Sequence, residues 1–263
     1  ALCERAVSAL DKTFDARWGG FGPAPKFPMP AILLFLLRQS RAAGNERALE
    51  MAEQTLLRLC EGGVFDHVGG GFMRYATDRA WRVPHYEKLL CDNALLARAY
   101  CEAWEATGKS VYRTVAERTL SYALEEMTRD QGGFCASQDA DAQGREGAYY
   151  LLSRPELVSL LGREDGAAYC AYYGIGQDSL PQRVGHEGGI ETPRMAALNE
   201  RVRRYRRERM PLARDEKVLT GWNGLMISAS RACTAQQGKG RGWTRQSAAR
   251  CLRVAACKGP RAG

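Results

Sequence analysis

The sequence predicts an all-α fold, an incomplete (α/α) toroid built from helical hairpins. Apolar residues recur with helical periodicity along most of the chain, and strand patterns are scarce. Paired glycines followed by an aromatic residue, as in Gly19-Gly20-Phe21 and Gly132-Gly133-Phe134, recur after helical stretches. A single motif of this kind is explained as well by a helix C-cap. Its recurrence favours a ring of helical hairpins whose loops gather polar residues into one cleft.

Helices are expected, in order, over residues 3–14, 30–43, 46–60, 86–106, 111–127, 155–161, 164–173, 195–210 and 218–228. Pro30 suits the first turn of its helix. Apolar residues cover much of the circumference of 86–106, which predicts burial on more than one side. Residues 195–210 are strongly basic and are expected to face solvent. The best strand candidate, 147–152, is expected to pair with 134–137 in a small β-hairpin on a loop.

Charge is distributed unevenly along the 263 residues. The chain has 38 Lys and Arg against 30 Asp and Glu, and residues 230–263 hold eight of the basic residues and none of the acidic ones. The rest of the chain is therefore neutral. Nucleic-acid binding by the tail is not favoured, because Trp243 is its only aromatic residue. We expect a partial toroid over 1–229 and an aberrant basic tail over 230–263, disordered or produced by a shifted reading frame.

Neither a membrane span nor a secretion signal is expected. The longest apolar run, 31–37, is too short to cross a bilayer, and the first ten residues lack a signal-peptide core. The chain opens inside a helical pattern without Met, so residues upstream are expected to be missing. Its nine cysteines form no C-x-x-C pair, which favours reduced thiols in the cytoplasm. No nucleotide-binding, serine-hydrolase or zinc motif is present, so we expect no cofactor and no metal.

The densest polar segment is 62–93. His85 follows Pro84, so it is expected in a first helical turn, where the helix dipole favours the neutral imidazole of a general base. Glu87 is the catalytic carboxylate expected beside it. Alternatively, His85 caps or packs, and Lys88 pairs with Asp92 on a helix surface. The ligand-binding candidates of this segment are Asp66, His67, Phe72, Arg74, Tyr75, Lys88, Asp92 and Asn93.

A second polar segment, 137–147, holds three carboxylates in eight residues. Asp139 and Asp141 are its catalytic candidates, and Gln138 is a binding candidate. A calcium loop is rejected, because Tyr150 stands where the bidentate Glu is required. A simple polar turn is the alternative.

A third segment contains Trp222 and Asn223, just before an apolar helix. The indole suits stacking on a sugar ring, and the amide suits hydrogen bonding to its hydroxyls. Capping and packing explain both residues equally well.

These segments together resemble a known family. The resemblance is carried by residues 19–28, 62–75, 81–93, 132–146 and 215–226, in the family's order. The chain is similar to the spermatogenesis-associated, thioredoxin-domain-containing family, which includes bacterial YyaL-like members. Met73 stands where that family usually has His, and the resemblance stops near Ser228.

The resemblance implies a thioredoxin-like domain followed by a six-hairpin (α/α)6 toroid, similar to N-acylglucosamine-type epimerases and six-hairpin glycosidases. The thioredoxin-like domain is expected in the full-length relatives and not in this chain. The implied ligand is a small sugar, with neither nucleic acid nor membrane as partner.

The expected activity is carbohydrate chemistry of the epimerase, isomerase or glycosidase kind, in a central cleft. His85 with Asp139 or Asp141 would transfer protons, and Phe72 and Trp222 would stack on the ring. One alternative is a non-catalytic toroid that binds a sugar or a partner beside a thioredoxin-like domain. Another is an inert product, which would aggregate through exposed core-facing helices.

Overall fold

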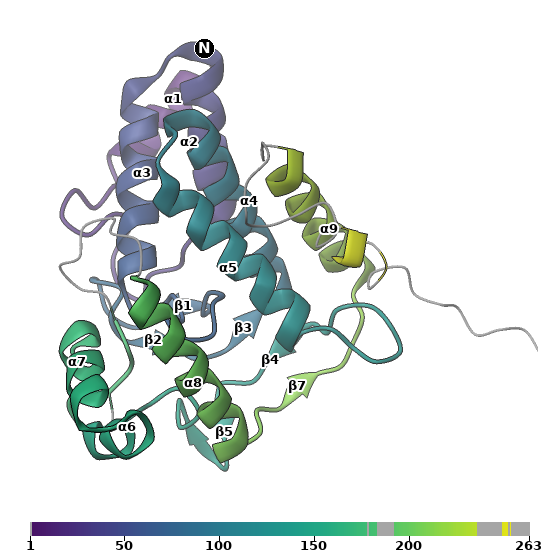
Figure 1. The fold of residues 1–263 in the computed structure, drawn as a ribbon. Coiled ribbons are helices and arrows are strands. Elements are labelled where there is room, and N and C mark those ends of the chain that lie inside the picture. The colour runs from purple at the N-terminus through teal and green to yellow at the C-terminus, as the bar shows by residue number, and fades with distance from the viewer. Residues whose placement is uncertain (1, 178, 183–191, 236–248, 252, 254–263) are drawn as a thin grey trace, which may run out of the picture.

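The computed structural model describes residues 2–177, 179–182, 192–235, 249–251 and 253, and these residues form a mainly helical molecule (Figure 1). The predicted tail therefore lies largely outside the described residues. The helices are α1 (Leu2–Asp11), α2 (Pro30–Ala43), α3 (Glu46–Glu61), α4 (Leu90–Thr107), α5 (Ser110–Glu126), α6 (Arg154–Leu161), α7 (Arg163–Tyr173), α8 (Pro193–Arg209) and α9 (Thr220–Ala235). The strands are β1 (Tyr75–Ala76), β2 (Pro84–His85), β3 (Lys88–Leu89), β4 (Ser137–Gln138), β5 (Asp141–Ala142), β6 (Arg145–Glu146) and β7 (Arg214–Asp215).

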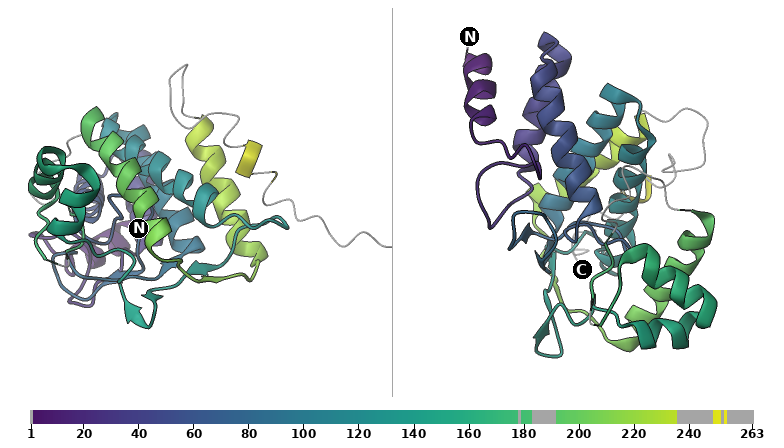
Figure 2. Two further views of the ribbon diagram at one scale, coloured as in Figure 1. Left: turned by 60° about the horizontal axis from the view of Figure 1, so that its bottom comes forward. Right: turned by 90° about the vertical axis from the view of Figure 1, so that its left-hand side faces the viewer.

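Helix α4 is the centre of the packing. It contacts α2, α5 and α9, while α3 packs on α2 (Figure 2). Buried side chains lie around its circumference, among them Leu96, Ala97 and Tyr100. The prediction of burial on more than one side is thus confirmed. Each large apolar side chain buried in this way contributes about 1.5–3 kcal/mol.

The connections alternate in length. Gly44 and Asn45 join α2 to α3, and the Asn45 side chain caps α3 by accepting the amide hydrogen of Ala48. Gly108 and Lys109 join α4 to α5 in the same brief way. The connections after α1, α3 and α5 are long, and the strands in the last two of them lie together at one end of the helices (Figure 1). The glycine-rich loops therefore lie at one end of the helices.

Each long connection opens with a related turn. Isolated antiparallel bridges join Phe14 to Phe21, Phe65 to Phe72 and Thr128 to Phe134. In every case the Gly-Gly pair lies directly before the closing phenylalanine. Three of the Gly-Gly-aromatic motifs therefore close related turns, and the third turn is one residue shorter than the other two.

Helices α6, α7 and α8 lie between α5 and α9 in the sequence and form a second apolar cluster of their own (Figure 2). A capping box of Ser153 and Glu156 begins α6. The prediction of a solvated helix over 195–210 is only half right. Met195, Leu198 and Val202 are buried on one face of α8, so this basic helix is amphipathic.

The structure corrects the predicted start of the helix over 86–106. Helix α4 begins at Leu90, and His85 lies in β2, where it pairs with Tyr75 of β1. Pro84 therefore belongs to a strand edge, which its missing amide hydrogen tolerates. The argument from the helix dipole does not apply to His85.

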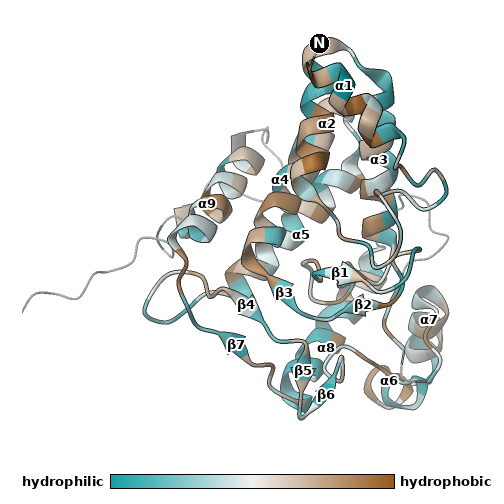
Figure 3. Ribbon diagram, turned by 180° about the vertical axis from the view of Figure 1, so that it is seen from behind, coloured by the Kyte–Doolittle hydropathy of each residue, from teal (hydrophilic) through white to brown (hydrophobic). Residues whose placement is uncertain are grey.

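Two further elements differ from their predictions. Residues 147–150 form a turn, and β4 pairs with β3 and β7, so the expected hairpin between 147–152 and 134–137 is wrong. The hairpin of this loop is instead β5–β6, a hydrophilic tip that projects from the strand end (Figure 3). Helix α9 continues past Ser228 to Ala235, with Ser230 and Cys233 buried.

Candidate functional site

A buried ion cluster joins the second long loop to α8. Asp66 receives hydrogen bonds from Lys88 Nζ at 2.9 Å and from both terminal nitrogens of Arg206, at 3.1 and 2.8 Å. The three side chains are at most 2% exposed. Burial alone would raise the pKa of Asp66, but the two cations outweigh it and hold that pKa well below its usual range.

The first long loop contains an equivalent cluster. Lys26 Nζ lies 2.6 Å from Asp15 Oδ2 and 2.7 Å from the Gly19 carbonyl, as Lys88 Nζ lies 2.8 Å from the Gly70 carbonyl. The second oxygen of each aspartate accepts amide hydrogens inside its own turn. Because the same arrangement occurs twice, Asp66 and Lys88 hold a loop in shape. Neither presents a charge to solvent.

Two asparagines fasten these turns to the helices that follow them. Asn93 Oδ1 accepts the amide hydrogen of Phe72 at 2.7 Å, and its Nδ2 donates to the Phe72 carbonyl at 3.0 Å. Asn223 makes the same two bonds with Phe134, at 2.8 and 3.2 Å. Each amide also donates to the carbonyl four residues before it. Both side chains are buried. The sequence singled out both residues, but as binding candidates and not as anchors of a turn.

Three more predicted binding residues lie inside the molecule. Gln138 accepts a hydrogen bond from Tyr122, and His67 Nε2 lies 3.1 Å from the Gly62 carbonyl. Phe72 has no exposed surface and stacks on Tyr100, so a stacking role for Phe72 on a ligand is wrong. Trp222 is partly buried against the main core.

His85, a predicted catalytic residue, is partly exposed and contacts a carboxylate. Its side chain is 28% exposed, and Nδ1 lies 2.7 Å from Glu146 Oε1. In the neutral ring, a carboxylate at this distance favours the proton on Nδ1 and leaves Nε2 as an acceptor. Nε2 lies 4.0 Å from Glu87 Oε2, beyond hydrogen-bonding distance. The imidazole also stacks on Tyr75, with ring centroids 5.1 Å apart.

More polar groups surround this imidazole. Arg74 donates to Glu87 at 2.9 Å. Asp92, on the first turn of α4, lies within electrostatic reach of both, and its pKa is raised because burial and the Glu87 charge outweigh the opposing effect of Arg74. Lys88 points instead to Asp66, so the alternative of a Lys88–Asp92 surface pair is wrong. His85, Glu87, Arg74, Tyr75 and Asp92 are thus gathered into one place.

Glu146 is the residue that sequence reasoning missed. It belongs to the second polar segment as its third carboxylate, but nothing in the spacing connects it to His85. The β5–β6 hairpin makes that connection, with Asp141 opposite Glu146 in the register. Asp139 and Asp141 are exposed, and the imidazole makes its hydrogen bond with Glu146 and with neither aspartate. We call His85, Glu146, Glu87, Arg74, Tyr75 and Asp92 the histidine cluster.

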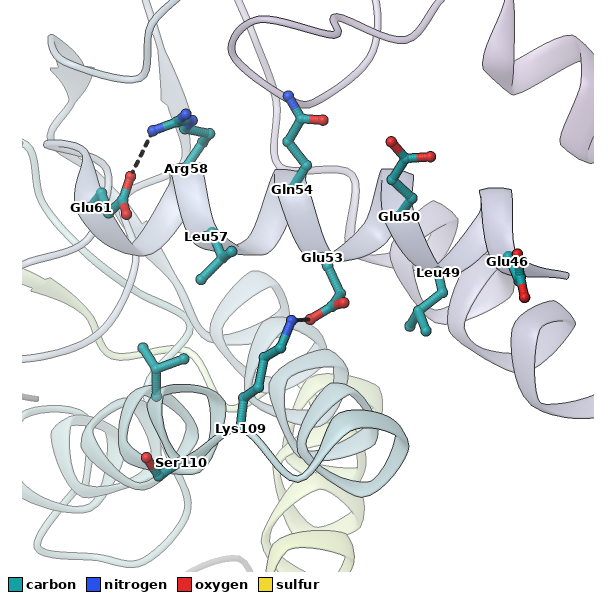
Figure 4. Close-up of a pocket in the computed structure, with 11 residues that line it drawn as sticks. Glu46, Leu49, Glu50, Glu53, Gln54, Leu57, Arg58, Glu61, Lys109 and Ser110 are labelled. Carbon is teal, nitrogen blue, oxygen red and sulfur yellow. Dashed lines mark hydrogen bonds and ion pairs between the residues drawn. The ribbon is translucent and has the colours of Figure 1, made fainter. Parts of the chain in front are cut away.

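A larger cavity lies away from the histidine cluster. A groove of about 750 Å³ runs along α3 to the start of α5, over Leu49, Leu57 and Val111 (Figure 4). Glu53 in its wall is paired with Lys109, and Glu61 with Arg58. None of the predicted site residues lines it. A cavity of about 280 Å³ is lined by Gln138 but not by His85.

The described part of the chain offers neither a metal site nor a membrane span. No group of three or more His, Cys, Asp or Glu side chains is placed to hold a metal ion. No helix there has the length and apolar character needed to cross a membrane. Eight cysteines are described, and all are free thiols.

The chain has relatives that are similar in sequence, and solved structures that share its fold. No protein-family model matches the chain. It is 35% identical to spermatogenesis-associated protein 20 of Rattus norvegicus over 269 residues, 85% of this chain and 34% of the relative. It is 34% identical to the protein of that name from Homo sapiens over 282 residues, 90% of this chain and 36% of the relative. These proteins are homologues, and the chain spans about a third of their length.

A glycoside hydrolase of family 76, a mannosidase from Bacteroides thetaiotaomicron, superimposes with a TM-score of 0.50 at 13% identity. The match covers 86% of this chain and 41% of the mannosidase. A sugar epimerase from a ruminal bacterium aligns with a TM-score of 0.49 at 13% identity, over 94% of this chain and 67% of the epimerase. The fold of the described helices is that of part of an (α/α)6 toroid, as the sequence predicted.

Proposed function

We propose that the chain is the toroid portion of a member of the family that includes spermatogenesis-associated protein 20, and that its histidine cluster performs acid–base chemistry on a sugar. The supporting observation is the short His85–Glu146 contact at the strand end of the toroid. A base oriented by a carboxylate, with its second nitrogen available to a substrate, is the arrangement that proton transfer requires. In the relatives, a thioredoxin-like domain would accompany this toroid in the cytoplasm.

The roles follow from the contacts. His85 Nε2 takes a proton from a carbon or a hydroxyl of the sugar, and Glu146 positions the ring. Glu87 is the second carboxylate beside the imidazole, and Arg74 and Tyr75 orient hydroxyl groups. Asp141, at the start of β5, and Asp139, just before it, would act only on a ligand that extends past Glu146.

Epimerisation is favoured over hydrolysis. Epimerisation next to a carbonyl needs a base that removes the hydrogen of the carbon, and His85 Nε2 supplies it. The imidazolium formed in this way returns a proton to the other face of the planar intermediate once that intermediate has rotated. Hydrolysis needs two carboxyl groups that work directly on the glycosidic bond. Here Glu146 is engaged by His85 and Glu87 by Arg74, so neither is held ready for that task.

A calorimetric titration tests the site. A panel of monosaccharides and disaccharides is titrated into the wild-type chain, His85→Ala and Glu146→Gln. We expect the wild type to bind, and each variant to lose roughly tenfold or more in affinity. His85→Ala removes the hydrogen-bond acceptor Nε2, and Glu146→Gln removes the carboxylate that orients the imidazole. Glu216→Gln, which removes a surface carboxylate outside the cluster, is the control and should bind as the wild type does. The absence of any sugar binding by the wild type would refute the proposal.

The second candidate is a non-catalytic toroid that binds a sugar or a protein partner. It is favoured by the burial of Asp66, Lys88, Asn93, Gln138 and Asn223, which leaves few polar groups for chemistry. It predicts binding that depends on His85, without proton exchange or turnover.

A further inference from the structure

The histidine cluster continues into a short aromatic stack. Tyr75 stacks on His85 with ring centroids 5.1 Å apart and an interplanar angle of 24°, and Phe27 packs on Tyr75 at 4.9 Å and 30°. Phe27 comes from the loop between α1 and α2, and it is 41% exposed, unlike the buried aromatic residues of the three repeated turns. The stack therefore ends in an aromatic ring that faces solvent.

The backbone under Phe27 is held from both sides. On one side, Lys26 is fully buried, paired with Asp15, and exchanges two backbone hydrogen bonds of 2.8 Å with Ala76. On the other side, Met29 is held in the left-handed region at φ 47° between two prolines. An exposed aromatic ring on so rigid a base loses little conformational freedom when a ligand covers it.

The spacing of the rings sets the size of a ligand that could use both groups. The two centroid separations limit the distance from Phe27 to His85 to no more than about 10 Å, and Tyr75 lies between them. A pyranose whose reacting carbon is at His85 Nε2 therefore has an exposed aromatic ring within the span of two linked sugar rings. A second sugar ring would reach it.

We propose that Phe27 is a second sugar subsite, which stacks on the ring adjoining the one at His85, so that the ligand of this surface is a disaccharide or a longer glycan. The inference rests on the proposed function, since it concerns the same ligand. Tyr75 supports Phe27 and sets its distance from the base. Aromatic stacking on the apolar face of a pyranose contributes to sugar binding without a charged group.

The test compares ligands of two lengths on the full 263-residue chain. Glucose, mannose, cellobiose and mannobiose are titrated calorimetrically into the wild type, Phe27→Ala, Phe27→Trp and Leu2→Ala. Leu2 is a matched control, because it is an equally apolar and more exposed residue, 78% exposed, on α1. Circular dichroism establishes that each variant is folded.

We expect Phe27→Ala to weaken disaccharide binding about tenfold and to leave monosaccharide binding within about a factor of two. Phe27→Trp should retain disaccharide affinity, and Leu2→Ala should match the wild type. Equal losses for both ligand lengths, unchanged disaccharide affinity in Phe27→Ala, or a wild type that prefers monosaccharides would each overturn the subsite while leaving the proposed function in place. A wild type that binds no sugar would overturn both.

Discussion

Individual glycines permit the close packing of the repeated turns. A Cβ on Gly20 would lie 2.6 Å from the Trp81 ring, whereas a Cβ on the neighbouring Gly22 would meet nothing within 4 Å. Both residues have a positive φ, of 77° and 75°. Trp81 cannot move aside easily, because it is fully buried and its indole nitrogen donates to the Trp18 carbonyl.

We therefore expect Gly22→Ala to lower the free energy of unfolding by about 1 kcal/mol, which is the backbone cost alone. Gly20→Ala should lower it by at least about 1 kcal/mol more, because overpacking adds to that cost. Urea denaturation of the two variants measures the difference. Equal effects would show that the approach to Trp81 is not tight.

Asp66 gives the fold a dependence on pH. Its folded pKa lies well below its usual range, although burial opposes this, because Arg206 and Lys88 stabilise the ionised form. In the unfolded chain the group titrates near its ordinary pKa of about 3.9. The stabilisation is therefore fully present above that pH, and it is lost as the pH falls toward the folded pKa.

Asp66→Asn should reduce the free energy of unfolding at neutral pH by about 3–5 kcal/mol, because two buried cations lose their counter-charge. The loss of stability on acidification should also become shallower than in the wild type. Asp15→Asn is the comparison, and a smaller effect is expected there because Arg79, one of its two partners, is 63% exposed. Denaturation series between pH 3 and 7 provide the test, and equal losses in the two variants would contradict the account.

At the scale of elements, two asparagines each join a turn to the helix that follows it. Asn93 anchors the turn that ends at Phe72, and Asn223 anchors the turn that ends at Phe134. Each contact is local to its own turn. The two substitutions should therefore have separate effects.

Asn93→Ala should speed amide hydrogen exchange at Phe72 and not at Phe134, and Asn223→Ala should do the reverse. Each should also cost about 2 kcal/mol, because buried backbone groups lose their partners. Hydrogen exchange measured residue by residue would decide this. Faster exchange at both phenylalanines in either variant would mean that the turns are not independent.

The sequence predicted most of the helices correctly, but it did not predict which side chains pair with each other. Helical periodicity located α2 to α5, and the glycine pairs located the repeated turns. The strand placement of His85 was missed, because Pro84 favours a helix start as well as a strand edge. The partner of Lys88 was missed because Asp66 is 22 positions away and Arg206 a further 140 from Asp66. Such pairs are fixed by packing, and no local pattern reveals them.

At the scale of the whole molecule, the toroid brings its long loops to one end. That arrangement places β1, β2 and the β5–β6 hairpin together, and with them His85, Glu87 and Glu146. Most other polar residues of these loops hold the turns in shape. The chemistry proposed for the molecule is therefore concentrated in the histidine cluster.

Proton exchange tests that claim most directly. The wild-type chain and His85→Ala are incubated in D₂O with reducing disaccharides, and proton NMR follows the signal of the hydrogen on the carbon next to the carbonyl. We predict that the wild type replaces this hydrogen with deuterium and that His85→Ala does not. A wild type that binds the sugar but leaves the hydrogen in place, or a His85→Ala variant that exchanges it equally fast, would contradict the account.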